Sequence, residues 1–284
     1  MTLLTPTEVT PGQIVVGGPA KQNIWTWAHM CVSLGKKVHI TCPFYPAIVD
    51  AVTKVGGTPQ YIDMTNGVDT AIDDIIKKIQ SGEITHLYLG FSTPIGTLPS
   101  EAKARKLEAI LKENPHIHWF DDYSLMYNML HPNAIKKVPH LNIETVINDK
   151  NTGVHMKNGS LSKPPFHYPG SRSGYAITNH QDLFCRTTIS MISHASVEQK
   201  AYLHNAFTHL NTLLQENKKI SSDRMQWLNA AQTRIEEETG LPCFGGEIGP
   251  FLFIDGNTLT ISGTEFQEKL QTGYWDSDQT TMLI

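Results

Sequence analysis

Short apolar runs alternate with segments of helical periodicity over the first two thirds of the chain. The runs predict strands at residues 13–16, 37–41, 59–63, 86–91, 117–120, 144–148 and 173–178. Helices are predicted between the first five of them, at residues 20–34, 48–55, 71–79 and 99–112. Helices that separate consecutive strands are typical of parallel pairing. The pattern therefore predicts an α/β fold built on a doubly wound, mostly parallel sheet.

The alternation of strands and helices ends near Ser193. Long helical segments follow at residues 197–217 and 222–239, and a strand at 250–254 and a helix at 264–270 close the chain. We interpret this change as a domain boundary. It predicts a large domain over residues 1–193 and a small α+β domain over residues 194–284.

The composition indicates a globular protein without a nucleic-acid or membrane partner. The 284 residues carry a formal net charge of −4, 40% of them are hydrophobic, and no basic stripe is present. The first residues have neither the basic nor the apolar region of a secretory signal. Four cysteines, at positions 31, 42, 185 and 243, fit neither a zinc motif nor a redox pair. We therefore expect reduced thiols in a cytoplasmic protein.

One pair of histidines has the spacing of possible metal ligands. His116 and His118 alternate along a predicted strand, which places both on one face of the sheet. No third ligand lies nearby in the sequence, so we predict no metal site.

The residues best suited to chemistry follow the predicted strands. In doubly wound sheets the site lies at the carboxyl ends of the strands. The loops that begin there contain Gly17-Gly18-Pro19, Pro43-Phe44-Tyr45-Pro46, Ser92-Thr93-Pro94 and Asp121-Asp122-Tyr123. We expect these loops to surround the site.

A further segment carries the most specific motif. Gly159-Ser160-Leu161-Ser162-Lys163 is followed by Pro169-Gly170-Ser171-Arg172-Ser173-Gly174-Tyr175. This pattern resembles the lysine signature of fold-type I pyridoxal-phosphate enzymes, the aminotransferase class I/II superfamily. The resemblance implies that Lys163 forms a Schiff base with the aldehyde of pyridoxal 5'-phosphate. It implies that Arg172 pairs with the cofactor phosphate, for which its planar fork is suited, and that Ser160 and Ser162 also bind the cofactor.

Two other segments resemble the cofactor-binding loops of the same superfamily. Residues 15–22 resemble the loop in which backbone amides at a helix N-terminus cradle the phosphate. The resemblance implies phosphate contacts from Gly18, Pro19, Ala20 and Lys21. The Pro43–Pro46 loop resembles a motif whose tyrosine stacks on the pyridine ring, which assigns that role to Tyr45.

The acidic loop supplies the remaining groups that the resemblance implies. A carboxylate beside the pyridine nitrogen keeps it protonated, and a tyrosine hydroxyl binds the phenolic oxygen of the cofactor. We assign Asp121 to the nitrogen and Tyr123 to the oxygen. Asp122 is the alternative to Asp121, because adjacent residues of a strand face opposite sides.

The sequence departs from the superfamily pattern in several places. Thr93 stands where an asparagine usually binds the phenolic oxygen, and a threonine hydroxyl donates over a shorter reach. Arg172 lies one position farther from Lys163 than is usual in the resembling motif. The chain is also short at both ends, and residues 258–284 contain no arginine for a substrate carboxylate. Lys21 and Arg186 are candidates to replace it.

The resemblance leaves more than one function open. We predict an aminotransferase that acts on a small amino acid and a keto acid through Lys163. A carbon–sulfur lyase of the alliinase type is the alternative, since residues 192–199 look closest to the alliinase and tryptophan-aminotransferase branch. A non-catalytic binding or partner subunit is an alternative of another class. Sites of this superfamily form at a two-fold interface, so we expect a homodimer.

Overall fold

The computed structural model describes residues 10–91, 94–125, 152–191, 195–246 and 251–255. Its main sheet contains β1 (Ile14–Gly17), β2 (Lys37–Cys42), β3 (Thr58–Asp63), β4 (His86–Leu89), β5 (His118–Asp122), β6 (His155–Ser160) and β7 (Gly174–Thr178). Its α-helices are α1 (Ala20–Cys31), α2 (Ala47–Lys54), α3 (Val68–Gln80), α4 (Glu101–Glu113), α6 (Gln181–Met191), α7 (Val197–Thr208) and α8 (Leu210–Thr239). Short 3-10 turns, η1 (Pro11–Gln13) and η4 (Pro169–Ser171), and the hairpin of β8 (Cys243–Gly245) and β9 (Leu252–Ile254) complete the described elements.

The main sheet is mixed, with parallel pairing through most of its width. The strand order is β1-β7-β6-β5-β4-β2-β3. Strands β6, β5, β4, β2 and β3 are parallel, whereas β7 is antiparallel to both of its neighbours. The predicted doubly wound, mostly parallel sheet is therefore confirmed. The carboxyl ends of the parallel strands meet at one edge, where the site was expected.

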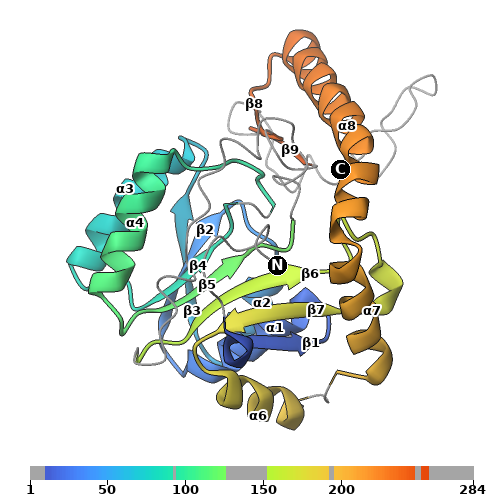
Figure 1. Cartoon of the computed structure of the whole chain (residues 1–284). Helices are drawn as coiled ribbons and strands as arrows, with labels where there is room; N and C mark the ends of the chain where they lie inside the picture. The colour runs from blue at the N-terminus through green and yellow to red at the C-terminus, as the bar shows by residue number, and fades with distance from the viewer. Residues whose placement is uncertain (1–9, 92–93, 126–151, 192–194, 247–250, 256–284) are drawn as a thin grey trace.

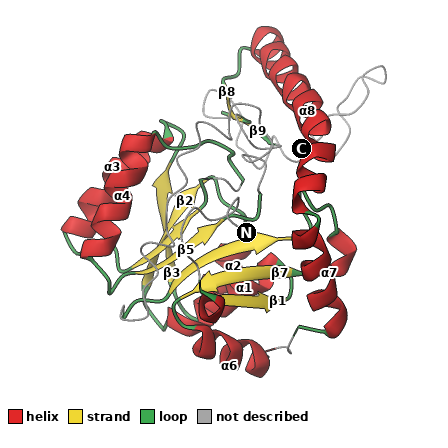
Figure 2. Ribbon diagram, in the orientation of Figure 1, coloured by secondary structure: helices red, strands yellow, loops and turns green. Residues whose placement is uncertain are grey.

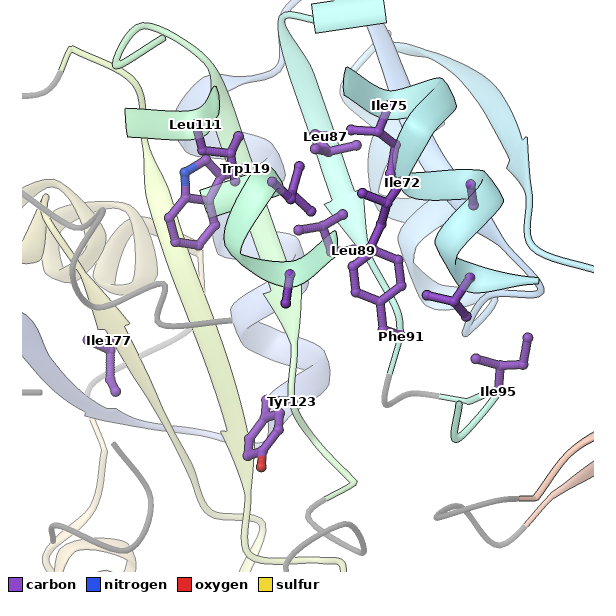
Figure 3. Close-up of a cluster of buried hydrophobic side chains, with 14 of the residues drawn as sticks. Ile72, Ile75, Leu87, Leu89, Phe91, Ile95, Leu111, Trp119, Tyr123 and Ile177 are labelled. Carbon is purple, nitrogen blue, oxygen red and sulfur yellow. The ribbon is translucent and has the colours of Figure 1, made fainter. Parts of the chain in front are cut away.

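Helices cover both faces of the sheet (Figures 1 and 2), so its central strands are buried on both sides. Strand β5 shows the consequence: Trp119 joins the core beneath α3 and α4, and Phe120 joins the core beneath α1 and α2. Figure 3 shows Trp119 beside Leu111 of α4, with Ile72 of α3 among the other labelled side chains of that cluster.

Local sequence signals set the limits of individual elements. The Ser100 hydroxyl caps α4 by accepting a hydrogen bond from the Lys103 amide at 3.4 Å. Helix α3 buries Ile72, Ile75, Ile76 and Ile79, the i, i+3, i+4, i+7 spacing of one apolar face.

One expectation from the sequence needs correction, and some elements were not predicted or lie outside the described residues. The helices predicted at 197–217 and 222–239 are α7 and the 30-residue α8, with the break at His209. There the Thr208 hydroxyl donates to the His204 carbonyl one turn back, a bond that often bends a helix, and the His209 ring bonds the Asn205 carbonyl. Strand β6 and helix α6 were not predicted. The segments predicted at 144–148 and 264–270 lie outside the described residues.

The second part of the chain begins against the sheet and then leaves it. Leu203, Ala206 and Leu210 of α7 and α8 are buried in the same core as α3 and α4. Farther along, α8 extends away from the sheet, and the β8–β9 hairpin lies beside its far end (Figure 1). Within the described ranges, no helix combines the length and apolar character that crossing a membrane requires. The division at 193/194 stays a prediction.

Candidate active site

Three segments of the predicted site meet in one row at the edge of the sheet. Gly17 and Ser160 both pair with Gly174, from opposite sides of β7. The packing there is close, because a Cβ atom on Gly174 would lie 2.9 Å from the Gly18 carbonyl oxygen and 3.1 Å from the Ala20 amide nitrogen. The phosphate-loop candidates therefore lie against the segment that follows Arg172.

Helix α1 begins at this row. Pro19 is its N-cap and has no side-chain acceptor with which to cap the first amides, and the first turn holds no acidic residue. Lys21 is exposed in that turn, and the Gln22 side chain lies over Gly18. Amide groups at a helix N-terminus attract anions. Because the first turn of α1 has no acidic side chain, no negative charge there opposes this attraction.

The predicted lysine lies in the loop after β6. The Lys163 side chain is exposed, and its carbonyl oxygen accepts hydrogen bonds from the Phe166 and His167 amides at 3.1 and 3.2 Å. One turn earlier, the Ser160 hydroxyl accepts from the Ser162 amide at 3.1 Å. The loop thus presents its amine outward from a hydrogen-bonded turn.

Arg172 follows the same loop with a strained backbone. Its φ of 47° lies in the left-handed region, which is uncommon for a residue other than glycine. The exposed guanidinium donates to the Pro169 carbonyl at 3.1 Å, and the Arg172 carbonyl accepts from Gln199 of α7 at 2.9 Å. Strain of this kind is concentrated at functional sites.

The structure separates the two candidate carboxylates. Asp122 accepts hydrogen bonds from the Tyr88 hydroxyl at 2.6 Å, the Ser124 hydroxyl at 2.5 Å and the Asn158 amide at 3.3 Å. Asn23 of α1 extends this buried network by donating to Asn158 at 2.8 Å. Asp122 therefore lies in a polar network that reaches α1.

Asp121 and Tyr123 face the other side of the sheet. Tyr123 belongs to the core beneath α3 and α4, and Asp121 pairs in register with Lys157 of β6. The buried Lys157 ammonium lies 4.5 Å from the centre of the Tyr123 ring. In Figure 3 the Tyr123 hydroxyl points away from the other labelled side chains of the core. Lys157 could not be predicted as a site residue, because a lone lysine is ordinarily a surface residue.

Tyr45 lies between β2 and α2 and is 40% exposed. Its neighbour Phe44 stacks on Tyr61 with ring centres 5.3 Å apart. Thr93 lies outside the described residues, and Arg186 is exposed on α6.

Burial dominates the electrostatics of the polar network. It raises the pKa of the Asp122 carboxyl, while the hydrogen bonds from Ser124, Tyr88 and Asn158 oppose the rise. Burial also raises the pKa of the Tyr88 hydroxyl well above its ordinary value, with Asp122 and, more weakly, Asp121 and Tyr45 acting in the same direction. Tyr88 therefore stays a neutral donor to Asp122.

A separate cluster at the amino ends of the strands brings Cys31, His86 and His118 together, with potential ligand atoms within 4.8 Å of one another. His118 Nδ1 accepts from the Val154 amide at 2.9 Å, which leaves its proton on Nε2. His86 Nε2 lies 3.0 Å from the Cys31 carbonyl oxygen and must donate to it. Burial raises the pKa of the Cys31 thiol well above its usual range. These hydrogen bonds use ring nitrogens that a metal ion would need, so we interpret the cluster as part of the packing. All four cysteines are free thiols.

Comparison with known proteins identifies the family of this chain. Residues 5–274 match the model of aminotransferase class I and II. No curated protein sequence matches the chain. Solved structures with the same fold include the aspartate aminotransferase of Rhizobium meliloti, at 19% identity and a TM-score of 0.71, and a tetra mutant of the Thermus thermophilus enzyme, at 12% and 0.77.

These two alignments cover 87% and 95% of this chain but 60% and 72% of the respective structures. The aspartate aminotransferase of Thermotoga maritima gives 14% identity and a TM-score of 0.69 over 94% of this chain and 67% of its own. At these identities the structures show a shared fold, while the family model extends over nearly the whole sequence. The chain belongs to the aminotransferase class I and II family, whose members use pyridoxal 5'-phosphate.

Proposed function

We propose that this chain is a pyridoxal-phosphate-dependent aminotransferase that acts on a small amino acid, with the cofactor attached to Lys163. The observation that carries the proposal is the row Gly17–Gly174–Ser160. It joins the phosphate-loop candidates to the lysine and arginine segments, which lie far apart in the sequence.

The residues in this row suit a phosphorylated cofactor. Gly18 and Ala20 approach Gly174 so closely that a side chain on Gly174 would clash with backbone, and a glycine permits such a close approach of the phosphate-loop candidates to β7. The Asn23 side-chain oxygen is buried without a hydrogen-bond partner in the described structure. A buried polar atom without a partner is unfavourable, and a donor from a ligand would satisfy it. Gly18, Pro19, Ala20, Lys21, Ser160, Ser162 and Arg172 would hold the phosphate end.

The other residues hold the ring and move the proton. Tyr45 would stack on the ring, and Tyr123 and Thr93 would bind its phenolic oxygen. Asp122, the alternative left open by the sequence, would bind the ring nitrogen, because its network leads to α1 and the phosphate loop. When bound, the cofactor supplies an electron sink for the substrate. Lys163 Nζ would accept the proton from the Cα atom of the amino acid.

A covalent label tests the proposal most directly. The purified chain is mixed with pyridoxal 5'-phosphate, its visible absorption is recorded, and borohydride reduction is followed by peptide mapping. We expect a yellow protein with the label on Lys163. Lys163→Ala should lose the label and amino-transfer activity, whereas Lys200→Ala, a matched change of an exposed lysine on α7, should keep both.

The products separate the remaining functions. Transfer moves the amino group to an added keto acid, whereas elimination releases ammonia without one. A colourless protein with no labelled lysine would favour a non-catalytic binding subunit. We also propose a homodimer, since members of this family commonly form dimers, and a cytoplasmic location, where free thiols persist. A measurement of molecular mass in solution tests whether the chain forms a homodimer.

A further inference from the structure

The loop after Lys163 has an unusual backbone conformation. His167 has a φ of 52°, in the left-handed region. A histidine there is uncommon, and such a conformation persists only where neighbouring groups maintain it. The loop also contains Pro164 and Pro165, which lack amide donors. The loop's own backbone hydrogen bonds therefore come from Phe166, His167 and Tyr168, and contacts from outside the loop add to them.

Asn217 of α8 provides those contacts. Its side chain is 6% exposed. Its amide nitrogen donates to the Pro165 carbonyl at 3.0 Å and to the Leu213 carbonyl at 2.8 Å. Its oxygen lies 2.5 Å from His167 Nε2, which is the donor because an amide oxygen only accepts. One side chain thus binds the loop at two points.

The turn that His167 closes begins at Lys163. The carbonyl oxygen of Lys163 accepts from the Phe166 and His167 amides. The Phe166 ring packs edge-on against Phe207 of α7, with centres 5.4 Å apart. Any displacement of His167 would therefore alter the turn from which the lysine side chain leaves.

We propose that Asn217 is a positioning residue that sets the direction of the Lys163 side chain through His167 and so couples α8 to the reaction. The inference rests on the proposed function of Lys163. Burial of an amide costs free energy unless its groups are paired, and here every polar atom of Asn217 is used. Helix α8 leads to the β8–β9 hairpin (Figure 1), and Asn217 joins this helix to the loop that carries Lys163.

The test compares Asn217→Ala with Gln215→Ala, a change of an exposed amide two positions earlier on α8. His167→Gly is the second variant, since glycine adopts the left-handed conformation without strain and preserves the fold if Asn217→Ala does not. Amide exchange of the full chain, without added cofactor, is followed by mass spectrometry. Visible circular dichroism of the pyridoxal-phosphate form reports how the cofactor is oriented.

We expect exchange over residues 163–168 to rise about five- to tenfold in Asn217→Ala and His167→Gly, the effect of losing one or two hydrogen bonds. The dichroism of the bound cofactor should weaken while the label stays on Lys163. Gln215→Ala should change neither. Faster exchange across the whole sheet would overturn the inference by showing a general structural role, as would unchanged exchange and dichroism. Absence of label on Lys163 in the unchanged protein would instead overturn the proposed function.

Discussion

Asp122 carries the clearest electrostatic signature of the candidate site. Its carboxylate is 1% exposed and accepts from the Tyr88 hydroxyl at 2.6 Å. Burial raises its pKa, and that hydrogen bond opposes the rise. Tyr88 therefore helps to keep Asp122 charged, the state in which a carboxylate can hold a protonated ring nitrogen.

Tyr88→Phe should raise the pKa of Asp122 further, because the hydroxyl stabilises the charged form. A hydrogen bond to a charged group contributes about 1.5–3 kcal/mol, so the free energy of unfolding should fall by that amount where Asp122 is ionised. Carbon NMR of the aspartate carboxyls without cofactor measures the pKa. Tyr61→Phe, at an exposed tyrosine, is the control. An unchanged or lower pKa in Tyr88→Phe would contradict the assignment.

At this scale the sequence limited the carboxylate to two adjacent residues and favoured Asp121, with Asp122 as the alternative, whereas we propose Asp122. The choice depends on which face of β5 meets α1. Alternation along a strand shows that Asp121 and Asp122 face opposite sides, but not which of them faces α1. In the structure Phe120 lies in the core beneath α1 and α2, so Asp122, two positions later, is on the same face of β5. Asn23 and Asn158, which complete the network, come from positions 135 residues apart, and no short motif joins them.

Among the elements, the junction of β1, β7 and β6 depends on one small residue. A Cβ atom on Gly174 would lie 2.8 Å from the Gly159 carbonyl oxygen and 2.9 Å from that of Gly18. Both neighbours are backbone, so neither can rotate away. Gly174→Ala should cost about 1–3 kcal/mol in the free energy of unfolding and weaken binding of pyridoxal phosphate.

Chemical denaturation of the protein without cofactor measures that cost. Gly170→Ala is the matched control, because a Cβ there meets nothing within 4 Å among the described residues, and its effect should stay within about 0.5 kcal/mol. Equal stability of the two variants would show that the junction relaxes.

Most strands and helices of the sheet could be predicted because their apolar periodicity matches their burial. Strand β6 could not, because its sequence, His-Met-Lys-Asn-Gly-Ser, is mainly polar although every residue is buried. Its polar groups have partners instead: the His155 ring lies 3.0 Å from the Ile117 carbonyl oxygen, and Asn158 joins the Asp122 network. A strand that buries hydrogen-bonded polar groups carries no hydrophobic signature.

Across the whole molecule, the two edges of the sheet differ in chemistry. The carboxyl edge holds the candidate site, and the amino edge holds a group of histidines. His86 and His118 stack with ring centres 4.6 Å apart, and His155 stacks on Trp119 at 4.8 Å. Burial, followed by the neighbouring histidines His86, His155, His180 and His116, lowers the pKa of His118 to about 4.

This edge should make the fold sensitive to acid. His118 has an ordinary pKa of 6.5 when unfolded and about 4 when folded, so the unfolded chain binds more protons between those values. The His118 contribution to the free energy of unfolding should therefore be fully present above pH 6.5, fall as the pH drops toward 4, and level off below that. The loss from this ring is at most ~3 kcal/mol, and less because it is partly exposed and solvent screens it.

His118→Asn, whose oxygen can accept from the Val154 amide, should flatten the curve measured by denaturation at several pH values. His116→Asn, at the exposed neighbour, should leave its slope nearly unchanged, and an equally steep curve in His118→Asn would show that other groups cause the acid sensitivity.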